Sequence, residues 1–130
     1  MATPTNTTFI ALFQDDVHEV IFKDMKPATL DQYFNYLEDL FKTTPEHQKI
    51  NILLNTLSGL PSFQNLAAQD RALRARFKRV PFVRLAVIYE NEAHLYFINM
   101  MLRVINLNRH MKMQIFPIQK KEDAVVWLRR

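Results

Sequence analysis

The sequence predicts an α/β domain built around a mostly parallel sheet. Short apolar runs typical of strands alternate along the chain with stretches of helical periodicity. The first two runs follow one another closely, as in a β-hairpin, and the later runs are separated by helices, which favours parallel pairing. The predicted order is β-β-α-β-α-β-α-β-α, with a five-stranded sheet, one antiparallel strand and about four helices.

The chain is expected to begin with a disordered segment and to continue as one domain. Residues 1–8 are rich in threonine and carry no basic residue, so they do not resemble a signal peptide. Residues 9–13 and 17–22 are predicted strands joined by the turn residues Gln14-Asp15-Asp16. Residues 9–130 have the length of one domain.

A regular amphipathic helix follows the hairpin. Its apolar positions recur every three or four residues and are Leu30, Tyr33, Phe34, Leu37, Leu40 and Phe41. The spacing of Thr29 and Gln32 predicts a capping box at its start. The pair Thr44-Pro45 predicts its end, because proline disfavours helical geometry in the residue before it.

The centre of the chain reads as a buried strand, a turn and a second helix. Residues 50–54 form a nearly continuous apolar run, as expected for a strand covered on both faces. The helix is expected to be capped by Ser62 and to extend through Phe77. Asp70 interrupts its apolar side, which indicates either an edge position that reaches water or an arginine, or a residue in a binding cleft.

The C-terminal part repeats the alternation of strands and helices. Strands are predicted at residues 83–89 and 111–116, the second stopped by Pro117. Residues 93–107 predict a helix that is apolar over most of its circumference, which suggests burial on several sides, in the core, a homodimer interface or against a lipophilic ligand. The final helix should bury Ala124, Val125, Trp127 and Leu128.

The composition excludes several classes of site. The chain has no cysteine, which removes disulfides, thiolate metal sites and cysteine nucleophiles, and fits a reducing cytoplasmic location. Its single glycine, Gly59, is too few for a dinucleotide-binding loop, a P-loop or a nucleophile elbow. The four histidines have no paired spacing, so we expect no metal and no cofactor.

The two halves of the chain carry opposite charge. Residues 1–65 hold four Lys/Arg and eight Asp/Glu, whereas residues 66–130 hold thirteen and five. This asymmetry indicates either an anionic partner or pairing of the two halves within the fold. Nucleic-acid binding is not expected, because no recognition motif accompanies the basic residues. No apolar run is long enough for a transmembrane helix.

Several segments, in order, resemble the SpoIIAA-like family of STAS-related domains. Residues 52–60, ILLNTLSGL, are similar to the family's LLDLSGL segment. Residues 77–80 followed by 83–88 resemble its basic approach to an RVAVV strand. Residues 113–116 followed by 122–128 resemble its RYF and EEAxxWL ending. The resemblance covers residues 9–130 and implies the SpoIIAA-like fold.

The resemblance also implies a mechanism that this chain does not reproduce. STAS domains that antagonise anti-sigma factors dock a partner kinase and are switched by phosphorylation of a serine in an Asp-Ser-Ser-Gly segment. The corresponding residues 63–68 contain no serine, Ser58 belongs to the preceding segment, and Ser62 lacks the motif's context. The phosphoserine switch is therefore not expected here.

The hypothesis from the sequence is a non-enzymatic STAS-like regulatory or protein-interaction module, with a protein partner or a second copy bound. Binding is expected outside the carboxyl ends of the parallel strands. The candidate residues are Asn55, Thr56, Ser58, Asp70, Tyr89, Glu90 and Asn91. The alternative is a small lipophilic-ligand (lipid or fatty acid) binding protein with a cleft beside the Ala93–Leu107 helix. An enzyme with Asp70 or Glu90 as general base is not expected, because no positioned partner is evident.

Overall fold

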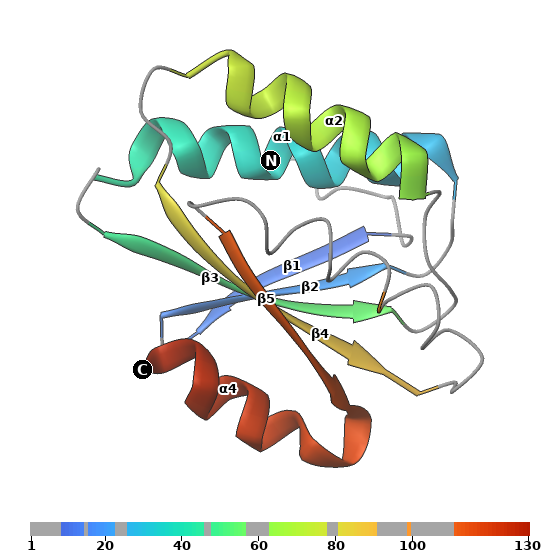
Figure 1. The fold of residues 1–130 in the computed structure, drawn as a ribbon, viewed down its shortest axis with the longest axis vertical. Helices are drawn as coiled ribbons and strands as arrows, with labels where there is room; N and C mark the ends of the chain where they lie inside the picture. The colour runs from blue at the N-terminus through green and yellow to red at the C-terminus, as the bar shows by residue number, and fades with distance from the viewer. Residues whose placement is uncertain are drawn as a thin grey trace, which may run out of the picture.

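The sheet has five strands in the order β1-β2-β3-β4-β5 (Figure 1). The computed structural model describes residues 9–14, 16–22, 26–45, 48–56, 63–77, 81–90, 99 and 111–130. β1 is antiparallel to β2, and β2 through β5 are mutually parallel. The predicted α/β class is confirmed.

The strands and helices lie close to the predicted positions. The strands are β1 (Phe9–Gln14), β2 (Val17–Phe22), β3 (Lys49–Thr56), β4 (Phe82–Tyr89) and β5 (Met111–Pro117). The helices are α1 (Pro27–Thr43), α2 (Phe63–Ala75) and α4 (Lys121–Arg129), the last preceded by a 3-10 turn, Ile118–Lys120.

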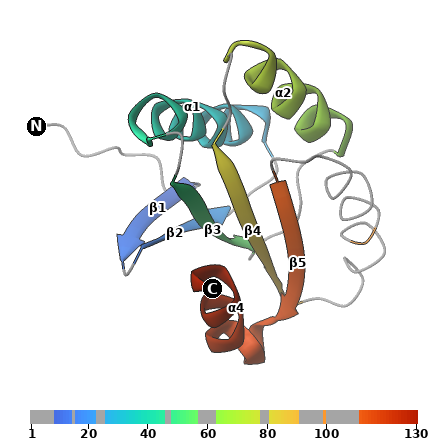
Figure 2. The same ribbon diagram turned by 60° about the vertical axis from the view of Figure 1, so that its left-hand side comes forward.

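The described helices cover both faces of the sheet. α1 and α2 lie together over one face, and α4 lies across the other (Figures 1 and 2). Successive parallel strands that are neighbours in the sheet, joined by crossovers of one hand, place the connecting helices on the same side. α4 follows the edge strand β5 and is free to turn back under the opposite face.

The alternation of side chains along each strand divides the core into two parts. Ile50, Ile52 and Leu54 of β3 face α1 and α2, where they join a cluster that includes Phe34, Leu37 and Leu73. Leu53, on the opposite face, packs with the α4 residues Ala124 and Leu128. Burial on both faces explains why β3 reads as a continuous apolar run.

The ends of several elements differ from the predicted ones. α1 begins at Pro27 with Lys26 as its N-cap and no side-chain cap, so the capping box was wrong. Proline at the first helical position needs no backbone N–H and starts the helix early. Thr29 is buried in the first turn. α2 ends at Ala75, short of Phe77, and β5 includes Pro117, which is tolerated at the end of an edge strand.

Acidic and basic halves of the chain contact each other in the fold. Glu38 of α1 forms an ion pair with Arg76, and Glu19 of β2 forms one with Lys121 of α4, at 2.9 and 2.8 Å. Part of the charge asymmetry is therefore internal pairing between the halves. No helix in the described part of the chain combines the length and the hydrophobicity needed to cross a membrane.

Candidate functional site

The predicted residues at the carboxyl ends of the strands do not form one group. Asn55 pairs in register with Ile88 and so faces α4, whereas Tyr89, one residue further, faces α1 and α2 and packs on their cluster. Asn55 is 6% exposed, and its Oδ1 accepts no hydrogen bond. Thr56 ends β3 and Glu90 is exposed after β4. The sheet thus separates Asn55 from Tyr89.

Other predicted features fall outside the described residues. These are Ser58, Asn91, the Ala93–Leu107 helix, the cap residue Ser62 and the N-terminal segment 1–8. The lipophilic cleft expected beside that helix therefore stays a prediction.

Asp70 forms an ion pair within α2. Its Oδ2 accepts a hydrogen bond from Nε of Arg74, one helical turn later, at 3.0 Å. The Arg74 guanidinium lies 5.9 Å from the ring centroid of Phe41, and its two terminal nitrogens have no partner. Burial raises the pKa of Tyr33 nearby, and the Asp70 charge raises it further. Asp70 was predicted either to reach water or an arginine at an edge, or to lie in a binding cleft. Its contact with Arg74 favours the first interpretation.

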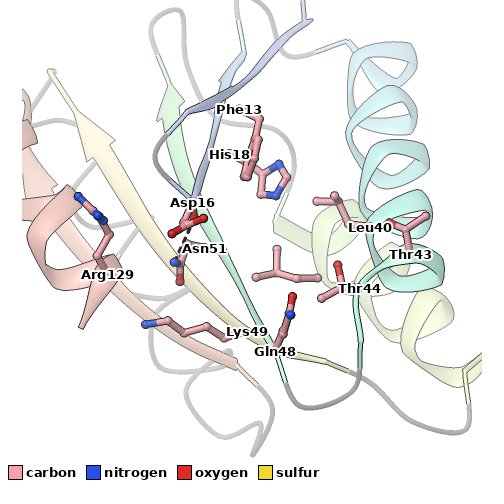
Figure 3. A pocket seen from close by; sticks show the side chains of 11 residues that line it. Phe13, Asp16, His18, Leu40, Thr43, Thr44, Gln48, Lys49, Asn51 and Arg129 are labelled. Carbon is pink, nitrogen blue, oxygen red and sulfur yellow. Dashed lines mark hydrogen bonds between the residues drawn. The ribbon is translucent and has the colours of Figure 1, made fainter.

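A pocket opens at the other end of the sheet, around the amino-terminal end of β3. Its volume is about 650 Å³, which lies in the range of small-molecule sites. Four segments line it, namely the β1–β2 hairpin, the end of α1, the start of β3 and the end of α4 (Figure 3). Because β2 and β3 are parallel and both begin here, the pocket lies opposite the end from which we expected binding.

One side of the pocket carries aromatic and aliphatic side chains, with Thr43 and Thr44 at the end of α1 beside them. The Phe13 and His18 rings, from paired positions of the hairpin, lie 4.5 Å apart, and Leu40 of α1 and Ile50 of β3 line the same side. The hydroxyl of Tyr36 and Nδ1 of His18 form a hydrogen bond of 2.7 Å. Burial lowers the pKa of His18, which favours the neutral imidazole and a hydroxyl that donates to it.

The other side carries positive charge at the C-terminal end of α4. Nζ of Lys49 donates a hydrogen bond of 2.8 Å to the Leu128 carbonyl, and Nη1 of Arg84 donates to the Trp127 carbonyl. Arg84 also lies over the Trp127 ring, 4.9 Å from its centroid. Both cations satisfy last-turn carbonyls and the negative end of the helix dipole. Burial, and then the Arg84 charge, lower the pKa of Lys49.

Asn51 lies between these two sides, at the base of the hairpin. Its Nδ2 donates to the backbone carbonyl of Asp16 at 3.1 Å, which ties β3 to the hairpin turn. Asp16 has a φ of 65°, a left-handed conformation that aspartate tolerates in turns. Asn51 is 5% exposed, yet its Oδ1 has no hydrogen-bond partner. An unpaired buried acceptor is costly, so Asn51 is unusual for a residue that only supports the fold.

The pocket combines apolar and cationic side chains. The described residues contain no group of three or more His, Asp or Glu side chains arranged to hold a metal ion. Sequence reasoning missed the pocket because its residues come from four distant segments. One local signal was present, since Asn51 interrupts the apolar run 50–54 at a position covered by α4.

Comparisons with known proteins identified no relative of this chain. A scan against protein-family models found no match, and neither the search of curated proteins nor that of solved structures found one.

Proposed function

We propose that this chain is a non-enzymatic protein-interaction module of the SpoIIAA-like, STAS-related type, without the phosphoserine switch. The hairpin followed by alternating parallel strands and helices supports the fold assignment. The observation that carries the interaction role is the outer edge of β1, to which no other described strand is paired.

The edge of β1 lacks the features that prevent edge strands from associating. Its sequence, FIALFQ, contains no charged residue and no proline, and Phe13 is 62% exposed. The opposite edge, β5, carries an exposed lysine, Lys112, and ends in Pro117. Charges and prolines are common means of protecting edges, so the two edges differ in their capacity to accept another strand.

The partner that fits this edge is a second copy of the chain. A two-fold antiparallel pairing of β1 with itself, centred between Ala11 and Leu12, places Phe13 opposite Ile10 of the other copy. It brings no like charges together, because the strand contains no charged residue. Such a contact joins the two sheets into one.

The test is the mass of the protein in solution as a function of concentration, measured by light scattering. Wild type should approach twice the 15.4 kDa of one chain, with slower exchange of the β1 amides. Phe13→Lys should raise the dimer dissociation constant at least about tenfold, because it places a charge at the edge. Val126→Lys is the matched control, since Val126 is 57% exposed on α4 and away from β1. A wild-type mass of one chain at about 1 mM contradicts the proposal.

A further inference from the structure

We propose that the pocket at the amino-terminal end of β3 binds a small organic anion with an apolar body, such as an alkyl or aryl carboxylate. This goes beyond the interaction role, which uses the edge of β1. The proposal rests on the division of the pocket into an apolar side toward α1 and a cationic side toward α4 (Figure 3).

The balance of charge around the pocket favours an anion. Lys49 and Arg129 line the pocket, and Arg84, which does not line it but acts on Lys49, adds a third positive charge at the end of α4. Asp16 contributes one negative charge, and the C-terminal ends of α1 and α4 contribute roughly half a negative charge each. The sum is a surplus of about one positive charge. None of these three cations forms an ion pair with a described carboxylate.

The cations keep donors for a ligand after their contacts with the helix. Lys49 has three N–H groups, one of which is used by the Leu128 carbonyl, and Arg129 is exposed on the pocket wall. Burial among cations disfavours the charged form of Lys49, and a bound carboxylate relieves this cost. The positive side of the pocket can therefore donate hydrogen bonds to a compact anionic group.

The apolar side of the pocket favours a ligand whose remaining part is apolar. Phe13 is largely exposed although it lies against His18, and Leu40, which is partly buried, extends the same wall. A ligand that covers these side chains removes apolar area from water, which is worth about 0.8 kcal/mol for each CH₂ buried, or roughly fourfold in affinity.

The experiment is calorimetric titration of the full chain with matched probes. Octanoate should bind saturably with a dissociation constant of about 1 mM or lower, and at least about tenfold more tightly than acetate, which lacks the apolar body. Octylammonium, of the same length and opposite charge, should not bind. Benzoate, which replaces the alkyl chain by a ring, distinguishes an aryl from an alkyl ligand.

Two variants locate the binding. Arg129→Gln should weaken octanoate binding about tenfold, because it removes a charged hydrogen-bond donor. Lys120→Gln removes an exposed cation at the opposite end of α4 and should leave binding unchanged. Both residues are exposed, and unchanged thermal unfolding checks the fold. Equal binding of octanoate and octylammonium, equal binding of octanoate and acetate, no saturation by octanoate or benzoate up to about 10 mM, or an equal effect of the two variants overturns the proposal.

Discussion

Lys49 and Arg84 should both anchor the C-terminal end of α4 to the sheet. The repulsion between their charges should reduce the stabilising contribution of each. Both donate a hydrogen bond to a last-turn carbonyl, and they lie close enough for Arg84 to lower the pKa of Lys49. Arg84→Met, Lys49→Met and the double variant remove these groups while keeping most of the apolar stem.

The expected losses follow from the contacts. A hydrogen bond from a charged donor contributes about 1.5 to 3 kcal/mol, and the contact of Arg84 with the Trp127 ring adds about 0.5 kcal/mol. We expect Arg84→Met to lower the free energy of unfolding by about 2 to 3 kcal/mol. Lys49→Met should cost less, about 1 to 2 kcal/mol, because burial already disfavours its charge. The double variant should lose more than the sum of the two single losses, by about 0.5 to 1 kcal/mol, because each single variant also relieves the repulsion between the two cations.

Trp127 is the single tryptophan of the chain and lies under Arg84, so its fluorescence reports the docking of α4. Urea unfolding followed by this fluorescence and by circular dichroism gives the free energies, and Arg84→Met should lower the melting temperature by about 6 to 10 °C. Lys112→Met is the control, because Lys112 pairs with Arg84 in register but is exposed. Additive or smaller-than-additive losses in the double variant would refute the repulsion, and a change below about 0.5 kcal/mol for Arg84→Met would refute the anchoring.

Two further predictions concern His18 and the α2 ion pair. Because burial lowers the pKa of His18 below 6.5, the unfolded chain binds a proton first, so the free energy of unfolding should fall as the pH drops below 6.5. His18→Gln should remove that part of the slope, and an unchanged slope in urea unfolding across pH 5 to 7 contradicts this. Asp70→Asn should cost about 1 to 3 kcal/mol, because it leaves the Arg74 guanidinium, whose side chain is 11% exposed, without its carboxylate. Adding Arg74→Met should recover most of that loss in thermal unfolding, and no recovery would show that the buried charge is not its cause.

The order of strands and helices was predictable because it depends on local periodicity. The apolar stripe of α1, the continuous run of β3 and the turn at Asp16 each hold their signal within a few residues. The start of α1 was misplaced by three residues, with Thr29 predicted as the N-cap in place of Lys26, since a proline at the first helical position and a capping box give competing signals for one end. The partner of Asp70 could not be predicted. An acidic residue on an apolar stripe does not indicate which cation it contacts, and Arg74 is one of several nearby arginines.

Local patterns along the chain were enough to predict the α/β class, the antiparallel hairpin and the approximate bounds of the described elements, because hydrophobic period and turn residues act over short distances. The arrangement of the candidate residues depends instead on tertiary contacts. It placed Asn55 and Tyr89 on opposite faces of the sheet, because adjacent register positions alternate between faces. It also brought Phe13, Lys49, Asn51 and Arg129 to one pocket at the amino-terminal end of β3. Their separation along the chain leaves no local pattern, so only the crossing of α1 and α4 over opposite faces creates that site.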